Sequence, residues 1–255
     1  MIFETHAHYD DSAFDEDRDE LLGKMQENDI GYIVNVGASL KSTAKSIELA
    51  KKYPYIYAAA GVHPSDTDEL DEKNFEWLKE QCKYEKVVAV GEIGLDYYWD
   101  EPDRKIQKKW FEKQLDLAIE IKKPVIIHSR DAAKDTYDIL VKKNAAQTGG
   151  VIHCYSYSAD MALEYVNMGF YIGVGGVVTF KNGKKLKETV EAIPIEKIVL
   201  ETDCPYLSPE PNRGKRNSSL NLTHIAQEIA QIKNISYEEV VDITLNNAKK
   251  LYKLG

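Results

Sequence analysis

At 255 residues, with 43% hydrophobic and 29% charged side chains, the chain has the size and composition of a globular protein with a substantial core. Its formal net charge of −9 argues against a protein that coats nucleic acid, because such binding depends on many Lys and Arg contacts to phosphate. The charge leaves open an enzyme that handles one phosphate at a time with a metal ion.

The sequence contains neither a membrane segment nor a disulfide framework. No run of about 18 apolar residues is long enough to span a bilayer, and the first residues, MIFETHAH, lack the basic start and apolar stretch of a signal peptide. The three cysteines, Cys82, Cys154 and Cys204, favour reduced thiols. We therefore expect a cytoplasmic protein that binds no membrane and has no obligate protein partner.

Short apolar, β-branched segments alternate with helical patterns along the whole chain. Near-continuous hydrophobic runs of this kind are typical of parallel strands buried on both faces. The predicted strands cover residues 2–8, 32–37, 55–63, 86–94, 124–130, 150–155, 170–176 and 197–203.

Helical periodicity fills the segments between the predicted strands. Residues 15–29 form the first predicted helix, with acidic side chains in its first turn, and residues 104–123 form another with one apolar stripe. Two helical patterns within 219–253 predict the last barrel helix and an extra C-terminal helix. Eight βα repeats predict a single α/β domain over residues 1–255, a (β/α)₈ TIM barrel with an extra C-terminal helix.

Reactive side chains gather at the predicted carboxyl ends of the strands, where the active site of such a barrel forms. Residues two apart on a strand face the same side, so His6 and His8 can hold one ion. Each histidine alone could be structural, and the metal interpretation depends on the whole set. Imidazole and carboxylate ligands in this number predict two divalent metal ions, Mg²⁺, Mn²⁺ or Zn²⁺. The metal set is His6, His8, Glu92, His128, His153 and Asp203, and His63 ends the third predicted strand beside it.

Basic side chains near these strand ends are the candidates for binding substrate. Barrels often bind phosphate at the loop after strand eight, here residues 204–219. A solvated basic loop is the alternative for each residue. His63, in GVHP, is a further candidate for contacting substrate beside the metal ions. The predicted basic contacts are Arg130, Arg213, Lys215 and Arg216.

Four other residues near the predicted site have two interpretations each. Tyr97 and Tyr98 follow Glu92 and could stack on a base or pack beneath a loop. Cys154 and Cys204 adjoin proposed ligands, but neighbours on a strand alternate faces. We expect both cysteines to be small packing residues.

Several segments resemble, in the right order, the signature segments of the TatD-related metal-dependent deoxyribonucleases. They are THAHYDD, GVHPSD, GEIGLDYY, PVIIHSRDA, GVIHCYS and LETDCPYLSP, with RGKRN and NNAKKLY as two more. The resemblance runs from Phe3 to about Tyr252. It implies a TIM barrel of the metallo-dependent hydrolase superfamily that hydrolyses phosphodiester bonds in DNA.

The resemblance also implies which residues hold metal. One ion would be held by His6, His8, Glu92 and Asp203, and a second by Glu92, His128 and His153, with Glu92 bridging. After His153 the family usually continues with Phe-Ser-Gly, here CYSYS, and after RGKRN with Glu-Pro, here SSLNLTHIA. Both departures bear on the shape of the substrate groove.

The hypothesis that follows is a deoxyribonuclease with Glu92 and Asp203 as catalytic residues. A water activated by two cations would attack phosphorus, and Asp203 would accept its proton. We expect a 3′–5′ exonuclease acting on DNA ends or short single-stranded DNA, because the net charge offers little for gripping long duplexes. The alternatives are a related metallohydrolase acting on a small phosphoester or a C–N bond, and a non-catalytic metal- or nucleic-acid-binding barrel.

Overall fold

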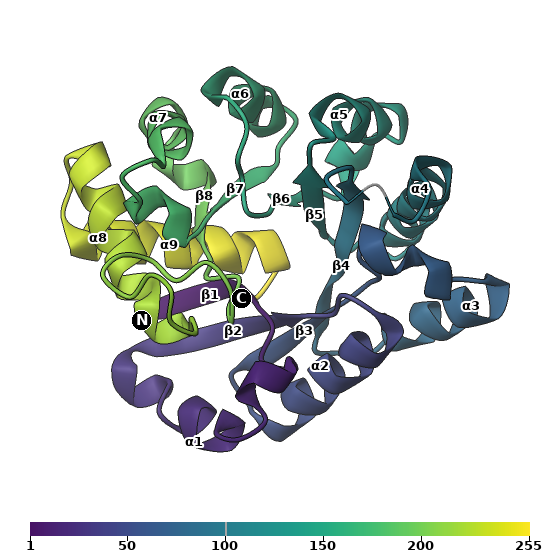
Figure 1. Ribbon diagram of the computed structural model, residues 1–255, viewed down its shortest axis with the longest axis horizontal. Helices are drawn as coiled ribbons and strands as arrows, with labels where there is room; N and C mark the ends of the chain where they lie inside the picture. Colours follow the sequence, from purple (N-terminus) through teal and green to yellow (C-terminus); the bar gives the residue numbers. More distant parts are fainter. Residues whose placement is uncertain (100) are drawn as a thin grey trace.

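The computed structural model describes residues 1–99 and 101–255 and contains one parallel sheet whose strands follow chain order from β1 to β8. The sheet curls into a barrel with helices on its outside (Figure 1). The predicted TIM barrel is therefore confirmed. The strands are β1 (Ile2–Ala7), β2 (Ile30–Val36), β3 (Ile56–Ala60), β4 (Val87–Asp96), β5 (Val125–Arg130), β6 (Gly150–Ile152), β7 (Tyr171–Val174) and β8 (Ile198–Leu200).

The helices of the described residues include the extra C-terminal helix, α9, and none of them is long and apolar enough to cross a membrane. The helices are α1 (Arg18–Gly23), α2 (Leu40–Lys52), α3 (Glu72–Gln81), α4 (Arg104–Glu120), α5 (Ala133–Lys142), α6 (Ala159–Asn167), α7 (Lys184–Ala192), α8 (Leu222–Lys233) and α9 (Tyr237–Tyr252).

The first helix is shorter than predicted. Instead of one helix over residues 15–29, α1 is flanked by two short 3₁₀ turns. Asp29 has a left-handed backbone with φ of 61°, which ends the helical run and lets β2 begin at the next residue. Strands β6 and β8 also end three residues earlier than the predicted 155 and 203. The chemically important residues after them therefore lie on turns.

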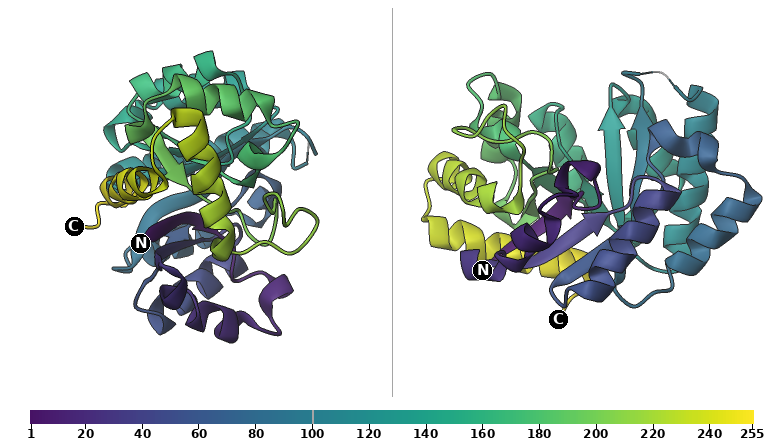
Figure 2. Two further views of the ribbon diagram at one scale, coloured as in Figure 1. Left: turned by 90° about the vertical axis from the view of Figure 1, so that its left-hand side faces the viewer. Right: turned by 60° about the horizontal axis from the view of Figure 1, so that its bottom comes forward.

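Apolar side chains fill both the barrel and the space between strands and helices. Inside the barrel, Phe3, Val34 and Ile126 belong to a buried cluster with residues of α9. Figure 2 shows α9 lying across the amino-terminal ends of the strands. The hydroxyl of Tyr252 donates to the Thr5 carbonyl at 2.8 Å. α9 thus closes the barrel at the end opposite the candidate site.

The barrel closes between β8 and β1 mainly through side chains. Among the described residues, β1 and the segment after β8 share one backbone bridge, between Ala7 and Cys204. The fully buried carboxylate of Glu4 accepts hydrogen bonds from the backbone N–H groups of His6 and Thr202 and from the hydroxyls of Thr202 and Ser219. Burial raises the pKa of Glu4 to about 8, although these hydrogen bonds oppose the rise. This network fixes His6 beside the segment that carries Asp203.

Candidate metal centre

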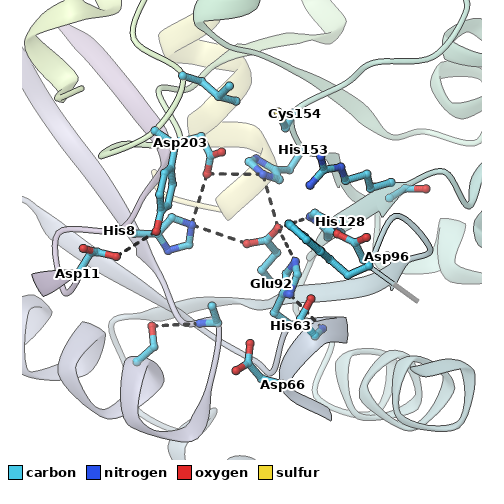
Figure 3. Close-up of a pocket in the computed structure, with 18 of the residues that line it drawn as sticks. His8, Asp11, His63, Asp66, Glu92, Asp96, His128, His153, Cys154 and Asp203 are labelled. Atoms are coloured by element: carbon cyan, nitrogen blue, oxygen red, sulfur yellow. Dashed lines mark hydrogen bonds and ion pairs between the residues drawn. The ribbon is translucent and has the colours of Figure 1, made fainter. Parts of the chain in front are cut away.

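The carboxyl ends of the strands surround a cavity of about 940 Å³, the size of a small-ligand pocket. His8, Glu92, His128, His153 and Asp203 all line it and point toward one another (Figure 3). The structure therefore brings together side chains that the sequence distributes over almost 200 residues.

Four ligand-type atoms form the first group of this centre. His6 Nε2 lies 3.0 Å from His8 Nε2 and 3.4 Å from Glu92 Oε2. Asp203 Oδ1 lies 3.4 Å from His8 Nε2 and 3.7 Å from His6 Nε2. Ligands placed tetrahedrally around one divalent ion stand about 3.4 Å apart. The four atoms therefore have the spacing that one ion requires.

The other oxygen of Glu92 faces the second group. Glu92 Oε1 lies 2.7 Å from His128 Nδ1, 3.5 Å from His153 Nε2 and 3.8 Å from His63 Nε2. The Nε2 atom of His128 lies 3.0 Å from Asp96 Oδ2. Because one oxygen of Glu92 faces each group, the geometry fits the bridging carboxylate that the family resemblance implies.

Neighbouring groups orient two of the imidazoles. His8 Nδ1 lies 2.9 Å from the Val36 carbonyl, which fixes the ring hydrogen on Nδ1 and leaves the Nε2 lone pair for a metal. His153 Nδ1 lies 3.2 Å from Glu201 Oε2. A Cβ at Gly173 would lie 2.3 Å from the same oxygen, so only glycine leaves room for the Glu201 carboxylate.

The sequence analysis did not single out Glu201 and Asp96, although the spacing of each from a proposed ligand could have indicated it. Glu201 precedes Asp203 by two residues, and Asp96 follows Glu92 by four, so each could share a strand face with a proposed ligand. Both are buried in the structure, at 1% and 2% exposure. A buried carboxylate beside an imidazole raises the basicity of that ligand.

His63 presents a ring N–H group toward the centre. Its Nδ1 accepts a hydrogen bond from the Ser65 N–H at 3.1 Å, which places the ring hydrogen on Nε2. Burial lowers the pKa of His63 to about 3, so the ring is neutral. The Nε2–H group faces the centre near Glu92, which is consistent with the predicted contact to substrate.

The predicted basic contacts divide into two kinds. Arg130 lines the cavity, and its guanidinium lies 3.8 Å from the ring centre of Tyr98. Arg216 pairs with Asp17 at 2.7 Å, and Arg213 covers the Phe180 ring at 4.3 Å. Neither of these two is among the described residues that line the cavity. Their predicted contact with substrate stays a prediction.

The two tyrosines and two cysteines near the predicted site differ in their burial. Tyr97 packs against the core and donates its hydroxyl to Asp135 at 2.7 Å, whereas Tyr98 is 55% exposed. Cys204 is fully buried, as expected of a packing residue. Cys154 lines the cavity, within metal-ligand reach of His153. Burial raises the pKa of the Cys154 thiol well above its ordinary value and keeps it protonated.

The carboxylates of the centre can hold cations. Burial would raise the pKa of Glu92, but the neighbouring imidazoles, His153 first, hold it well below its ordinary value. Burial would also lower the pKa of His8 and His153, but Asp203 raises the former to about 9, and Glu201 and Glu92 raise the latter to about 10. Within the described residues, no Lys or Arg pairs with Glu92 or Asp203. The donor set fits divalent metal ions.

Metal binding is expected to release protons near neutral pH. Without metal, His8 and His153 carry protons, since their pKa values lie above the ordinary 6.5, and ligation must displace them. In the metal-free protein, protonation of His8 and His153 stabilises the folded state. We expect this contribution to be complete below pH 6.5 and to be lost as pH rises through about 9 to 10. Metal affinity should rise over the same range.

Calorimetric titration with Zn²⁺ or Mn²⁺ at pH 7.5, in two buffers of different ionisation enthalpy, measures the release directly. A binding enthalpy that does not depend on the buffer would contradict this protonation state.

Comparison with known proteins identifies the family. The family model described as TatD related DNase matches residues 3–253. The chain belongs to the TatD family. The metal-dependent hydrolase YabD of Bacillus subtilis is 43% identical over the full length of both chains. The metal-dependent hydrolase YcfH of Escherichia coli K12 is 32% identical, over 100% of this chain and 96% of that one.

Solved structures agree with this family assignment. The crystal structure of YJJV, a TatD homologue from Escherichia coli, matches with a TM-score of 0.93 and 29% identity, over 100% of this chain and 98% of that one. This TatD-family chain is therefore a metal-dependent hydrolase with His, Asp and Glu clusters that can bind metal. The family resemblance read from the sequence motifs is confirmed.

Proposed function

We propose that this TatD-family hydrolase is a deoxyribonuclease that removes nucleotides from the 3′ ends of single-stranded DNA. The observation that carries the proposal is the position of Glu92 between two groups of imidazoles at the floor of the cavity. The family description, TatD related DNase, supports DNA as the substrate.

The charge of the cavity favours DNA ends over the interior of a duplex. Arg130 is the one Lys or Arg among the described residues that line it, whereas several carboxylates do. A protein that grips long duplexes needs many contacts from cations to phosphates. A cavity of about 940 Å³ with one guanidinium suits a terminal nucleotide and its phosphate instead.

The proposal includes two divalent ions, each with its own ligands. His6, His8 and Asp203 would hold one, and His128 and His153 the other, with Glu92 shared between them. Bound there, the ions would supply positive charge that lowers the pKa of water and offsets charge on the phosphate.

In this proposal Asp203 accepts the proton of the water. Its Oδ1 faces His6 and His8, and within residues 1–99 and 101–255 its Oδ2 takes no hydrogen bond. Burial would raise the pKa of Asp203, but the hydrogen bond from His8 keeps it below its ordinary value, so the carboxylate is ionised. Its side chain is 18% exposed, which allows contact with water.

Hydrolysis of each phosphodiester bond consumes one water molecule. The water oxygen bonds to phosphorus, the bond from phosphorus to the 3′ oxygen breaks, and the proton of the water passes to Asp203. The 3′ oxygen takes a proton from solvent. His63 donates its Nε2–H to a phosphate oxygen, and Arg130 places a positive charge beside the same group.

The test is a time course with metal-stripped protein on a 5′-labelled single-stranded DNA oligomer, with Mg²⁺, Mn²⁺ or Zn²⁺ added back. The His128→Ala variant, purified alongside, controls for contaminating nucleases. We expect a metal-dependent ladder that shortens from the 3′ end and is absent with the variant. An oligomer that stays intact under every metal, while a small phosphoester or an amide is hydrolysed, would overturn the proposal.

A further inference from the structure

Exposed aromatic side chains concentrate at the mouth of the cavity. The described residues include seven exposed large hydrophobic side chains, and four of them lie on two loops, after β4 and after β8. They are Tyr98, Trp99, Tyr206 and Leu207. Trp99 is 66% exposed and Tyr206 55%. Clustered exposed apolar groups beside a cavity mark a binding surface, because leaving them in water is unfavourable.

The two loops lie on opposite sides of the cavity. β4 and β8 are half a barrel apart in an eight-stranded order, and Trp99 and Tyr206 both line the cavity. Trp99 follows Asp96 by three residues, and Tyr206 donates its hydroxyl to Asp11 at 3.1 Å. Asp96 and Asp11 lie at the two sides of the centre in Figure 3. The rings therefore flank the entrance.

Hydrogen bonds and ring contacts link the segments that carry Trp99 and Tyr206 to residues of the candidate metal centre. On one side the backbone N–H of Tyr206 donates to the Asp203 carbonyl at 2.9 Å. On the other, Trp99 meets the Tyr98 ring edge-on, with 5.0 Å between ring centres and 90° between planes. The backbone N–H of Tyr98 donates to Asp96 Oδ1 at 3.0 Å, and the Tyr98 ring carries the Arg130 guanidinium. The rings and one positive charge thus have fixed places relative to the centre.

We propose that Trp99 and Tyr206 stack on unpaired nucleobases on the two sides of the phosphate to be cleaved, and so select single-stranded ends. The proposal rests on the proposed nuclease function and names what its site recognises. Every base has a π-face, so two aromatic rings bind any sequence. A base in a duplex offers its faces to its neighbours, so a paired end must open before the rings can hold it.

The first test measures binding without cleavage. Of the three tryptophans, Trp110 is buried and Trp77 packs against the core, so Trp99 alone is highly exposed. Titrating the metal-loaded enzyme with thymidine 5′-monophosphate, the type of product released, should quench tryptophan fluorescence, whereas deoxyribose 5-phosphate should not. Quenching should persist in Trp77→Phe and disappear in Trp99→Leu. Equal quenching in Trp99→Leu, or none in the parent enzyme, overturns the proposal.

The second test measures KM and kcat. Trp99→Leu and Tyr206→Leu should each raise KM for oligothymidylate about 10-fold, as expected for one lost base–aromatic stack, with a smaller change in kcat. For an oligomer whose last two nucleotides are abasic, both variants should match the parent enzyme. Val141→Ala, at a 52% exposed apolar position on α5, is the matched control. An equal rise in KM on base-bearing and abasic ends would assign the rings a merely structural role.

The two tests separate this proposal from the nuclease function. Cleavage of the oligomer without base-dependent quenching would support the nuclease function and contradict the proposed aromatic contacts. Quenching that depends on Trp99, in the absence of cleavage, would support nucleotide binding at the mouth of the cavity and contradict the nuclease function.

Discussion

Glu92→Gln is expected to lower kcat by about 10⁴-fold, the equivalent of several kcal/mol of lost charge stabilisation. Gln keeps the shape of the side chain but removes the negative charge that faces both groups of imidazoles. Its amide nitrogen would also turn a donor toward ring nitrogens that should receive metal. We therefore expect loss of bound metal along with turnover.

The measurement combines turnover with metal content by mass spectrometry. The matched control is Asp66→Asn, another carboxylate that lines the cavity but contacts none of these imidazoles among the described residues. It should keep both metal and activity. Circular dichroism checks that each variant is folded. More than a tenth of the parent turnover in folded Glu92→Gln would rule out a shared carboxylate at the centre of the mechanism.

Asp203→Asn is expected to separate proton transfer from metal binding. The amide keeps an oxygen where Asp203 Oδ1 faces His6 and His8, so metal content should stay near that of the parent enzyme. The variant loses the group that accepts the proton, which is worth about 10² to 10⁴ in rate. The acidic limb of the pH–rate profile, which reports the ionised Asp203, should disappear with it.

An equal loss of metal and activity in Asp203→Asn would make this residue a ligand without a role in proton transfer. Activity near that of the parent enzyme would exclude both roles. Asp66→Asn again provides the control for removing a carboxylate from the cavity.

Strand periodicity made much of the centre predictable. His6 lies in β1 and His8 one residue past its end, and their Nε2 atoms are 3.0 Å apart, as expected when residues two apart in an extended segment face the same side. Glu92 and His128, on β4 and β5, follow from the same rule because parallel strands end at the same edge. Local pattern was sufficient for His6, Glu92 and His128, which lie within strands, although it did not single out Asp96 at the end of β4.

The sequence identified His153 and Asp203 as candidates, but the backbone conformation after the strands was beyond the reach of local pattern. Asp203 and Cys154 have left-handed backbones with φ of 56° and 46°, a conformation that non-glycine residues adopt only when their surroundings enforce it. The contacts of the loop arginines within the fold were unpredictable for a related reason. Arg216 finds Asp17 199 positions away, and nothing near Arg216 in the sequence announces that partner. Long-range contacts decide which of several similar cations reaches the cavity.

The closure of the barrel by α9 also constrains how the protein is made. Synthesis produces His6 and His8 first, but the floor of the barrel beneath them is completed by Leu251 and Tyr252, and the Tyr252 hydroxyl anchors the backbone one residue before His6. A nascent chain still lacking α9 has an open apolar barrel end and no such anchor. Competence to hold metal should therefore arise late, once the segment that carries α9 has left the ribosome.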